Sequence, residues 1–332
     1  MNAPVPGFLA PRESEYASLR SREEQLEFLV RYAALAPSNR NSQPWRFSVG
    51  RDRITLHAEL SRWQEVSDTR QREVYVSLGC ALENLLIAIE HFGLGHVVTL
   101  CPDTDDTSIA AQVAVLERPV PSHFRTGGMF RAIVGRRTHH GRYLRRSIPS
   151  AVLGNLRDCN VDADLTLLLT RNPDIRRSVT LLARRGNALS LAAPGYRREL
   201  AASIGNGNFG GPRLLALAEQ FAVAHLGFGR AVARGDHEAL AGSPVFGLIS
   251  GETGHRPLQI KTGQLLERLY LVAAAHGLSL QPVSQLLEND EVQAEFARLF
   301  RAGGVPIIPF RLGYASSRAH PTPRLPRDKI LF

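Results

Sequence analysis

The chain has 332 residues, of which 44% are hydrophobic and 21% charged, a composition typical of a globular protein with room for one large or two smaller domains. No apolar stretch approaches the ~20 residues of a membrane span, and the first residues lack the charged and apolar regions of a secretory signal. The formal charge of +9 is spread over scattered residues, mostly arginine, which argues against a nucleic-acid partner and permits an anionic small ligand such as a phosphate.

The three cysteines, Cys80, Cys101 and Cys159, lie far apart in the sequence and form no C-x-x-C pair. This spacing suggests neither a disulfide framework nor a zinc site, and it fits a reducing cytoplasm. We therefore expect a cytoplasmic protein that needs no metal.

The segment LAPSNRNSQPW, residues 35–45, follows an amphipathic helical run and combines side-chain amides and hydroxyls with a large aromatic residue. Pro44 predicts an extended backbone at Gln43, and Trp45 is expected to be a packing anchor. Two β-like segments follow, residues 45–50 and 54–60, and the turn between them predicts a hairpin.

Residues 79–94, GCALENLLIAIEHFGL, and residues 263–278, GQLLERLYLVAAAHGL, resemble each other at one constant offset. Each is apolar on nearly every face, which predicts a helix buried on all sides, and each ends in a glycine suited to a left-handed C-cap. Any two buried helices share some likeness. The common Gly-x-x-Leu-Glu opening and Gly-Leu ending nevertheless favour an internal duplication.

Further β-compatible segments lie in the second half, and Pro and Gly cluster between the halves at residues 116–128. These segments are residues 162–170, 243–250 and 305–314. We predict an α+β fold with two related halves, residues 20–120 and 128–332. Such a chain resembles a fused dimer in which the two similar helices pack at a pseudo-twofold axis.

The segment RRTHH gathers two guanidinium groups and a hydroxyl near an expected helix. Arg136, Arg137 and Thr138 predict a cradle for a phosphate dianion, through charge-assisted and often bidentate hydrogen bonds. A solvated basic patch is the alternative, and this segment alone does not decide between them. His139 and His140 are adjacent, so their side chains diverge and a shared metal is not expected.

The segment GNGNFG, residues 205–210, matches the dinucleotide motif G-x-G-x-x-G only by letter. A dinucleotide site needs an apolar strand before the motif, whereas residues 197–204 look helical and Pro212 follows at an expected first helical position. We interpret residues 195–213 as a candidate lid with a glycine loop.

APSNRNSQPWRF, together with GCALENLLIAIEHFGL, strongly resembles the nitroreductase superfamily of flavin proteins, in which an A-P-S-x-x-N-x-Q-P-W loop lies against FMN. RRTHH resembles the family's R-R-S-x-R phosphate motif, and RLGYASSRAHPTPRLP resembles its C-terminal tail. Two such halves in one chain resemble the Acg-type branch, where two units that normally form a homodimer are fused. The likeness covers roughly residues 26–330.

Only the first half has the amide loop, and only the second half has the arginine motif. In the dimeric family one flavin takes contacts from both subunits. The complementary loss therefore implies one composite FMN site, with its mirror-related site decayed.

The resemblance implies roles for two sets of residues. Those implied for the phosphate and ribityl group are Arg136, Arg137, Thr138 and Arg324, with His140 where the family usually has Arg or Lys. Those implied for the edge of the isoalloxazine ring are Pro37, Ser38, Asn39, Asn41 and Gln43. The segment SGETG resembles the one that brings backbone N–H groups toward flavin N5, so Glu252 and Gly254 are weaker candidates. The histidine at 140 weakens the local positive charge, and Arg142 is placed to compensate.

The function implied by the resemblance is an FMN-dependent oxidoreductase that passes hydride from NAD(P)H to the flavin and then to a nitroaromatic or quinone. The flavin carries the chemistry, so no catalytic side chain is expected. The alternatives are an FMN-binding or flavin-storage protein with a closed pocket, and a specialised flavin dehydrogenase acting on a biosynthetic intermediate. A fused pseudo-dimer is expected to be a monomer or a homodimer.

Overall fold

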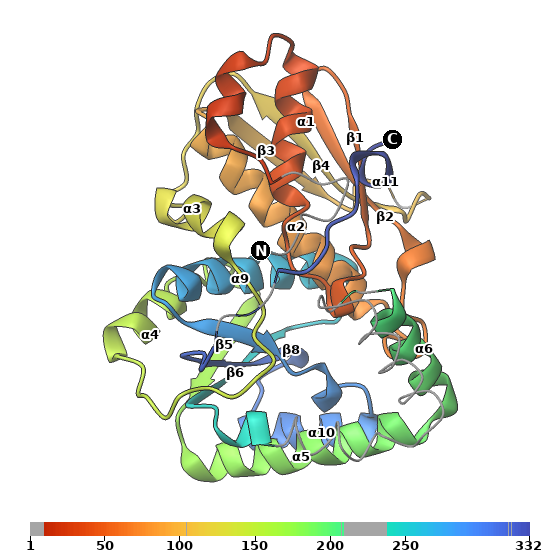
Figure 1. The fold of residues 1–332 in the computed structure, drawn as a ribbon, viewed down its shortest axis with the longest axis vertical. Coiled ribbons are helices and arrows are strands. Elements are labelled where there is room, and N and C mark those ends of the chain that lie inside the picture. The colour runs from red at the N-terminus through yellow and green to blue at the C-terminus, as the bar shows by residue number, and fades with distance from the viewer. Residues whose placement is uncertain (1–9, 104, 207, 209–237, 318, 320) are drawn as a thin grey trace.

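The structure is a computed structural model that describes residues 10–103, 105–206, 208, 238–317, 319 and 321–332. Two four-stranded antiparallel sheets lie toward opposite ends of the molecule, with helices α2 (Arg72–His91) and α9 (Arg256–Ala275) between them (Figure 1). This arrangement confirms the predicted α+β architecture with two halves in one chain.

The first sheet has the strand order β1-β2-β4-β3. Its strands are β1 (Trp45–Val49), β2 (Arg53–Ala58), β3 (Gly95–Leu100) and β4 (Ile109–Leu116). The predicted hairpin is confirmed, because β1 and β2 pair antiparallel from Trp45 opposite Ala58 to Val49 opposite Ile54. Trp45 is fully buried, as expected for a packing anchor. Helix α1 (Arg22–Ala33) starts at a capping box formed by Ser21 and Glu24 and packs against α2.

The second sheet has the strand order β5-β6-β8-β7. Its strands are β5 (Leu165–Thr170), β6 (Val245–Gly251), β7 (Ser279–Pro282) and β8 (Val305–Gly313). The other helices are α3 (Gly127–Gly135), α4 (Ser150–Arg157), α5 (Pro173–Ala192), α6 (Pro194–Gly205), α10 (Asp290–Phe300) and α11 (Arg327–Ile330). Short 3-10 helices lie at Glu13–Ser18, Asn39–Asn41, Leu60–Arg62 and Ser284–Leu286. Helices α5 and α10 pack together and cover the outer side of this sheet.

The two sheets have the same connectivity around their helices. In each half, two strands precede the long helix and two follow it, and the last strand returns to the middle of the sheet. The halves differ in what joins the first two strands, because a tight turn joins β1 to β2, whereas α5 and α6 lie between β5 and β6. The structure therefore extends the sequence repeat from one helix to a whole half.

Helices α2 and α9 pack closely where the repeated glycines meet. A Cβ atom on Gly79 would lie 2.0 Å from the carbonyl oxygen of Ile260, and one on Gly263 would lie 2.0 Å from that of Val76. Only glycine permits this separation of the two backbones. Nearly every residue of α2 is buried, which confirms the prediction of a helix enclosed on all sides.

Both helices end in the same way. Gly93 and Gly277 have positive φ angles of 78° and 70°, and the next residues, Leu94 and Leu278, donate backbone hydrogen bonds of 3.1 and 2.8 Å to the last helical turn. This hydrogen-bond pattern is a Schellman motif. The predicted left-handed caps are therefore confirmed at both copies.

Contrary to the expectation that no apolar stretch approaches a membrane span, helix α2 is long and apolar enough to cross a membrane by length and composition alone. However, 89% of its most apolar 18-residue window is buried inside the structure, as in the core helix of a soluble protein. Its apolarity is accounted for by its contacts with α1 and α9.

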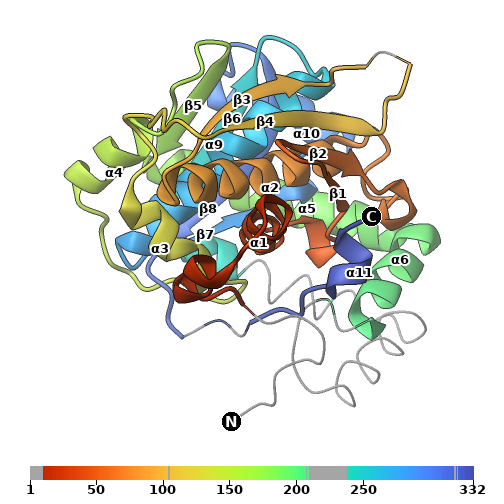
Figure 2. The ribbon, with the colours of Figure 1, turned by 90° about the horizontal axis from the view of Figure 1, so that it is seen from above.

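The end of the chain leaves the second half and returns to the first. After β8, Ala315 still forms a bridge with Tyr143 of the second half. Farther along, Leu331 forms a parallel bridge with Phe47 of β1, and the backbone N–H of Phe332 donates to the Phe47 carbonyl at 3.1 Å. Figure 2 shows α11 and the C-terminus beside β1 and α1. The second sheet lies within residues 128–332, while the tail of this segment contacts the other half.

Candidate functional site

The amide loop, residues 35–45, holds an unusual backbone. Arg40, Asn41 and Gln43 have positive φ angles of 46°, 56° and 50°, a conformation that residues other than glycine rarely adopt. The hydroxyl of Ser38 accepts a hydrogen bond from the backbone N–H of Gln43 at 2.9 Å and closes the turn. Each residue in this conformation raises the conformational free energy of the backbone by on the order of 1–3 kcal/mol, and three lie within four positions. Contacts with the surrounding structure must therefore hold the loop in this shape.

The extended conformation predicted for Gln43 is wrong. The local preference of a residue before proline is overridden by tertiary contacts, because the Gln43 side chain is 3% exposed and its Oε1 accepts from the backbone N–H of Leu325 at 3.0 Å. Asn41 reinforces this link, since its Nδ2 donates to the carbonyl of Pro323 at 2.9 Å. The C-terminal tail therefore holds the loop in its strained shape.

Two arginines from the second half meet at the same carbonyl of the first half. Arg136, at the end of α3, donates from Nη2 to the carbonyl of Leu35 at 3.2 Å, and Arg324 donates to the same oxygen at 2.9 Å. Arg324 also donates to Oδ1 of Asn41 at 2.5 Å. Arg137 follows directly and donates to two backbone carbonyls, Val134 at 2.8 Å and Arg136 at 2.7 Å. The arginine motif and the amide loop thus form one cluster, as the composite-site hypothesis requires.

This arginine cluster has more positive charge than its protein neighbours neutralise. Nε and Nη1 of Arg136 and Nε of Arg324 are buried without a hydrogen-bond partner among the described residues. The nearest carboxylate is that of Glu267 in α9, whose Oε1 lies 3.7 Å from Nε of Arg136, beyond hydrogen-bond distance. Burial first, and then the charges of Arg136 and Arg137, lower the pKa of Arg324 to about 9. An anion placed here would receive free donors and relieve this repulsion.

The mirror-related position is neutralised from within the protein. Glu83, the repeat equivalent of Glu267, accepts two hydrogen bonds from Arg125, at 2.8 and 3.1 Å, and one from Gln264 at 3.0 Å. The remaining Arg125 nitrogen, Nη1, donates to Glu90 at 2.7 Å. Carboxylates therefore satisfy the arginine on one side of the pseudo-twofold axis, and buried donors stay unpaired on the other.

Glu267 provides a test of this asymmetry through pH. Burial raises its pKa to about 7, and the nearby Arg136 offsets the rise only in part. Between the ordinary carboxyl pKa and about 7, folded Glu267 holds a proton that the unfolded chain has released. The stabilisation from this proton is thus fully present below the ordinary carboxyl pKa, and it is lost as the pH rises toward 7. We expect the Glu267→Gln variant to lose less stability than the parent between about pH 5 and pH 8.

Urea unfolding at several pH values would measure this slope. Asp68, whose pKa burial also raises to about 7, remains in both proteins, so the slope should shrink rather than vanish. Glu83→Gln is the matched comparison, because the pKa of Glu83 is lowered. Removing this carboxyl should leave the decline of the free energy of unfolding between about pH 5 and pH 8 in place. Equal slopes in the parent and Glu267→Gln would contradict the assignment.

Thr138 and His140 lie beside groups that sequence reasoning did not select. The Thr138 hydroxyl lies 3.1 Å from the hydroxyl of Tyr270 in α9, and Nδ1 of the exposed His140 lies 2.9 Å from Nε2 of Gln281 in β7. Fully buried Arg311 of β8 donates to Gln281 at 2.6 Å and to the carbonyl of His140 at 3.0 Å, which holds this turn.

The sequence offered a signal for Arg311. A charged residue within the apolar run VPIIPFRLGY requires buried partners, and the structure shows that these include the side chain of Gln281 and the backbone carbonyl of His140 in the arginine motif. Glu267 and Tyr270 offered no such signal, since both lie in a helix whose apolar neighbours suggested only packing.

The remaining predicted residues divide into two groups. Pro37, Ser38 and Asn39 are half-buried in the amide loop, and the backbone N–H of Asn39 donates to the hydroxyl of Ser77 in α2 at 3.3 Å. Glu252 and Gly254 are exposed before the start of α9. From that start to Glu267 the helix rises about 16 Å, so the structure does not bring these two residues into the arginine cluster.

The described part of the candidate lid is docked on the amide loop. Residues 197–204 lie in α6, which confirms their helical prediction, and Glu199 of α6 pairs with Arg40 at 3.0 Å. The Arg40 guanidinium also lies 4.7 Å from the ring centre of Tyr196, and Glu199 accepts from the Ser67 hydroxyl at 2.5 Å. Positions 207 and 209–213 of the candidate lid, which include the end of GNGNFG and Pro212, lie outside the described residues.

No group of three or more His, Cys, Asp and Glu side chains in the described part of the chain is placed to hold a metal ion. All three cysteines are free, with Cys80 and Cys159 buried.

No family model matches the chain. The chain is 26% identical over 330 residues to the Mycobacterium tuberculosis protein named "putative NAD(P)H nitroreductase Rv3131", covering 92% of this chain and 90% of that protein. It is also 26% identical over 318 residues to the "putative NAD(P)H nitroreductase acg" of the same species, covering 91% and 92%. Among solved structures, a nitroreductase with bound FMN from Desulfitobacterium hafniense gives a TM-score of 0.42 at 11% identity, over 62% of this chain and 98% of that chain. At this TM-score the structural likeness is weak, so the two sequence relatives carry the comparison.

Proposed function

Because the chain is a relative of the Acg-type nitroreductase-like proteins over nearly its whole length, we propose that it is an FMN-dependent oxidoreductase using NAD(P)H. The observation that supports this most strongly is the arginine cluster. Arg136 and Arg324 meet at the amide loop with buried, unpaired donors, and Arg137 adds a third positive charge beside them.

The residues present fit the phosphate of FMN. A phosphate dianion offers acceptor oxygens for the free donors of Arg136 and Arg324, and its charge would bring the pKa of Arg324 back up. The Thr138 hydroxyl, already beside Tyr270, is available as a further donor. The single cluster, with its mirror position closed by carboxylates, supports one flavin per chain.

The amide loop fits the second half of the cofactor. The side-chain amide of Asn39 forms no hydrogen bond with another described residue, so it offers both a donor and an acceptor, the combination that a flavin's pyrimidine edge needs. The C-terminal tail fixes Asn41 and Gln43 through hydrogen bonds within the chain, and a loop held in this way would lower the entropy cost of binding. When bound, the flavin would supply the hydride chemistry between the nicotinamide donor and a nitroaromatic or quinone acceptor.

An absorbance spectrum with anaerobic addition of NADPH or NADH tests the proposal. We expect purified protein, or protein incubated with FMN, to show flavin absorbance that nucleotide bleaches and a nitroaromatic restores. Protein that fails to bind added FMN would contradict the composite site. Protein that binds FMN but is bleached only by dithionite would support the second candidate.

That second candidate is a flavin-storage protein with a closed pocket. It is favoured by one observation, the docking of α6 on the amide loop through Arg40 and Glu199. The ion pair is only 9% and 15% exposed, so breaking it has a real cost. If this contact closes the pocket, a Glu199→Gln variant should be reduced by NADPH faster than the parent.

The assembly state belongs to the same proposal. The contact that a nitroreductase-like homodimer would form between two chains is made here inside one chain, by α2 and α9. We therefore propose a monomeric pseudo-dimer, which light scattering of the purified protein would check.

A further inference from the structure

A second concentration of arginine lines a cavity in the second half. The cavity has a volume of about 770 Å³, within the range of small-molecule sites. Its walls come from the segment after the arginine motif, the end of β5, the first turn of α5 and the start of β6. Five arginines line it, namely Arg142, Arg145, Arg146, Arg171 and Arg176, together with a single carboxylate, that of Glu238.

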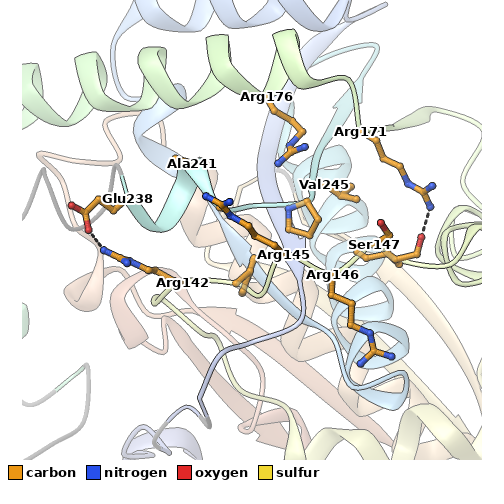
Figure 3. A pocket seen from close by; sticks show the side chains of 13 residues that line it. Arg142, Arg145, Arg146, Ser147, Arg171, Arg176, Glu238, Ala241 and Val245 are labelled. Atoms are coloured by element: carbon orange, nitrogen blue, oxygen red, sulfur yellow. Dashed lines mark hydrogen bonds and ion pairs between the residues drawn. The ribbon is translucent and has the colours of Figure 1, made fainter.

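Most of these guanidinium groups are positioned by neutral partners, which leave their positive charge without a neutralising carboxylate. Arg176 donates from Nε to the carbonyl of Ser243 at 2.7 Å, Arg171 donates to the carbonyl of Ile148, and Arg146 lies 4.1 Å from the ring centre of Tyr314. Only Arg142 pairs with the carboxylate, Glu238, at one side of the cavity (Figure 3).

Arg145 is the exception among the five. It is exposed, forms no hydrogen bond or ion pair with any described residue, and extends between Arg142 and Arg176 (Figure 3). Arg176 points into the same space from α5. The donors of this guanidinium are therefore available to an anion, which would also reduce the like-charge repulsion from the neighbouring arginines.

The wall shared with the arginine motif is rigid. Tyr143 is buried, its ring centre lies 4.3 Å from the guanidinium of Arg311, and Arg311 also holds the carbonyl of Gly141 at 2.8 Å. This cavity is lined by none of the residues of the arginine cluster at the amide loop. It is therefore a cavity separate from the arginine cluster at the amide loop.

We propose that this cavity binds a phosphorylated small molecule through at least one phosphoryl group. Arginine forks match phosphate geometry bidentately, and the five arginines lie around one cavity of small-molecule size. Two sources share this chemistry, namely the 2′-phosphate of NADPH and a separate phosphorylated ligand. The first source rests on the proposed function, while binding of phosphate to the cavity does not.

Titration calorimetry with pyrophosphate at low ionic strength tests the site. We expect Arg145→Gln to weaken pyrophosphate binding about tenfold, the effect of losing one charge-assisted hydrogen bond at a partly solvated site. Arg51→Gln, which removes the same charge from the exposed β1–β2 turn, should leave the affinity unchanged. Arg324→Gln identifies pyrophosphate bound at the amide-loop cluster instead, because such binding would be lost in this variant and kept in Arg145→Gln.

Three outcomes would overturn the proposal. They are a parent protein that does not bind pyrophosphate, an equal loss in Arg51→Gln, and a loss in Arg324→Gln without one in Arg145→Gln. The KM values of Arg145→Gln for NADPH and NADH, compared with those of the parent, then separate the two sources. A tenfold rise for NADPH alone assigns the cavity to the 2′-phosphate, and unchanged KM values assign it to a separate ligand. Failure of the proposed oxidoreductase function would appear as an unbleached flavin and would leave the pyrophosphate result standing.

Discussion

Replacing Gly79 with alanine is expected to lower the free energy of unfolding by about 3 kcal/mol, the upper end of the usual cost of overpacking, because the contact is with backbone atoms. The added Cβ would lie 2.0 Å from the Ile260 carbonyl oxygen and 2.8 Å from the Cα of Gly263. Both obstacles are backbone atoms, so relief requires moving α9 as a whole. Urea unfolding would measure the loss, and Gly263→Ala should show it as well.

Gly154→Ala is the matched control. Gly154 also lies within a helix, α4, but a Cβ there would meet nothing within 4 Å. Alanine should therefore stabilise the protein by roughly 0.5–1 kcal/mol through helix propensity. The double variant at 79 and 263 should be far from additive, because both changes act on one contact. A Gly79→Ala protein as stable as the parent would contradict the close packing of the two helices.

Local sequence patterns were sufficient to predict the two central helices and the first hairpin. The buried helices, their glycine caps and the β1–β2 hairpin all follow from periodicity and turn residues within about twenty positions, and these features depend little on distant contacts. Gly79 and Gly263 occupy equivalent positions in the two copies of the repeat, and this indicated that the two helices pack at the pseudo-twofold axis. The path of the tail was not predictable in this way, since the bridge between Phe47 and Leu331 joins residues at opposite ends of the chain.

The candidate site also combines features that sequence motifs predicted with features that distant contacts determine. Its loop and its arginines were predicted by motif, and the structure brings Arg136, Arg324 and Asn41 together. The positive φ of Gln43 was not predicted, because the tail imposes it against local preference. The contrast between Glu83 and Glu267 was also hidden, as the two occupy equivalent repeat positions and differ only in which arginine approaches them.

Replacing Arg324 with glutamine should weaken FMN binding about a hundredfold, the effect of removing a partly buried guanidinium from a bound phosphate. The charge of Arg324 is destabilised without an anion, as its lowered pKa shows, and this makes an anion's contribution larger. Arg327→Gln removes the same charge three residues away, where the side chain is 69% exposed and pairs with Glu27, so FMN affinity should stay within about twofold. Quenching of flavin fluorescence on titration would give both dissociation constants. Equal affinities in the two variants would mean that the tail arginine holds only the loop, through Leu35 and Asn41, and that the phosphate lies elsewhere.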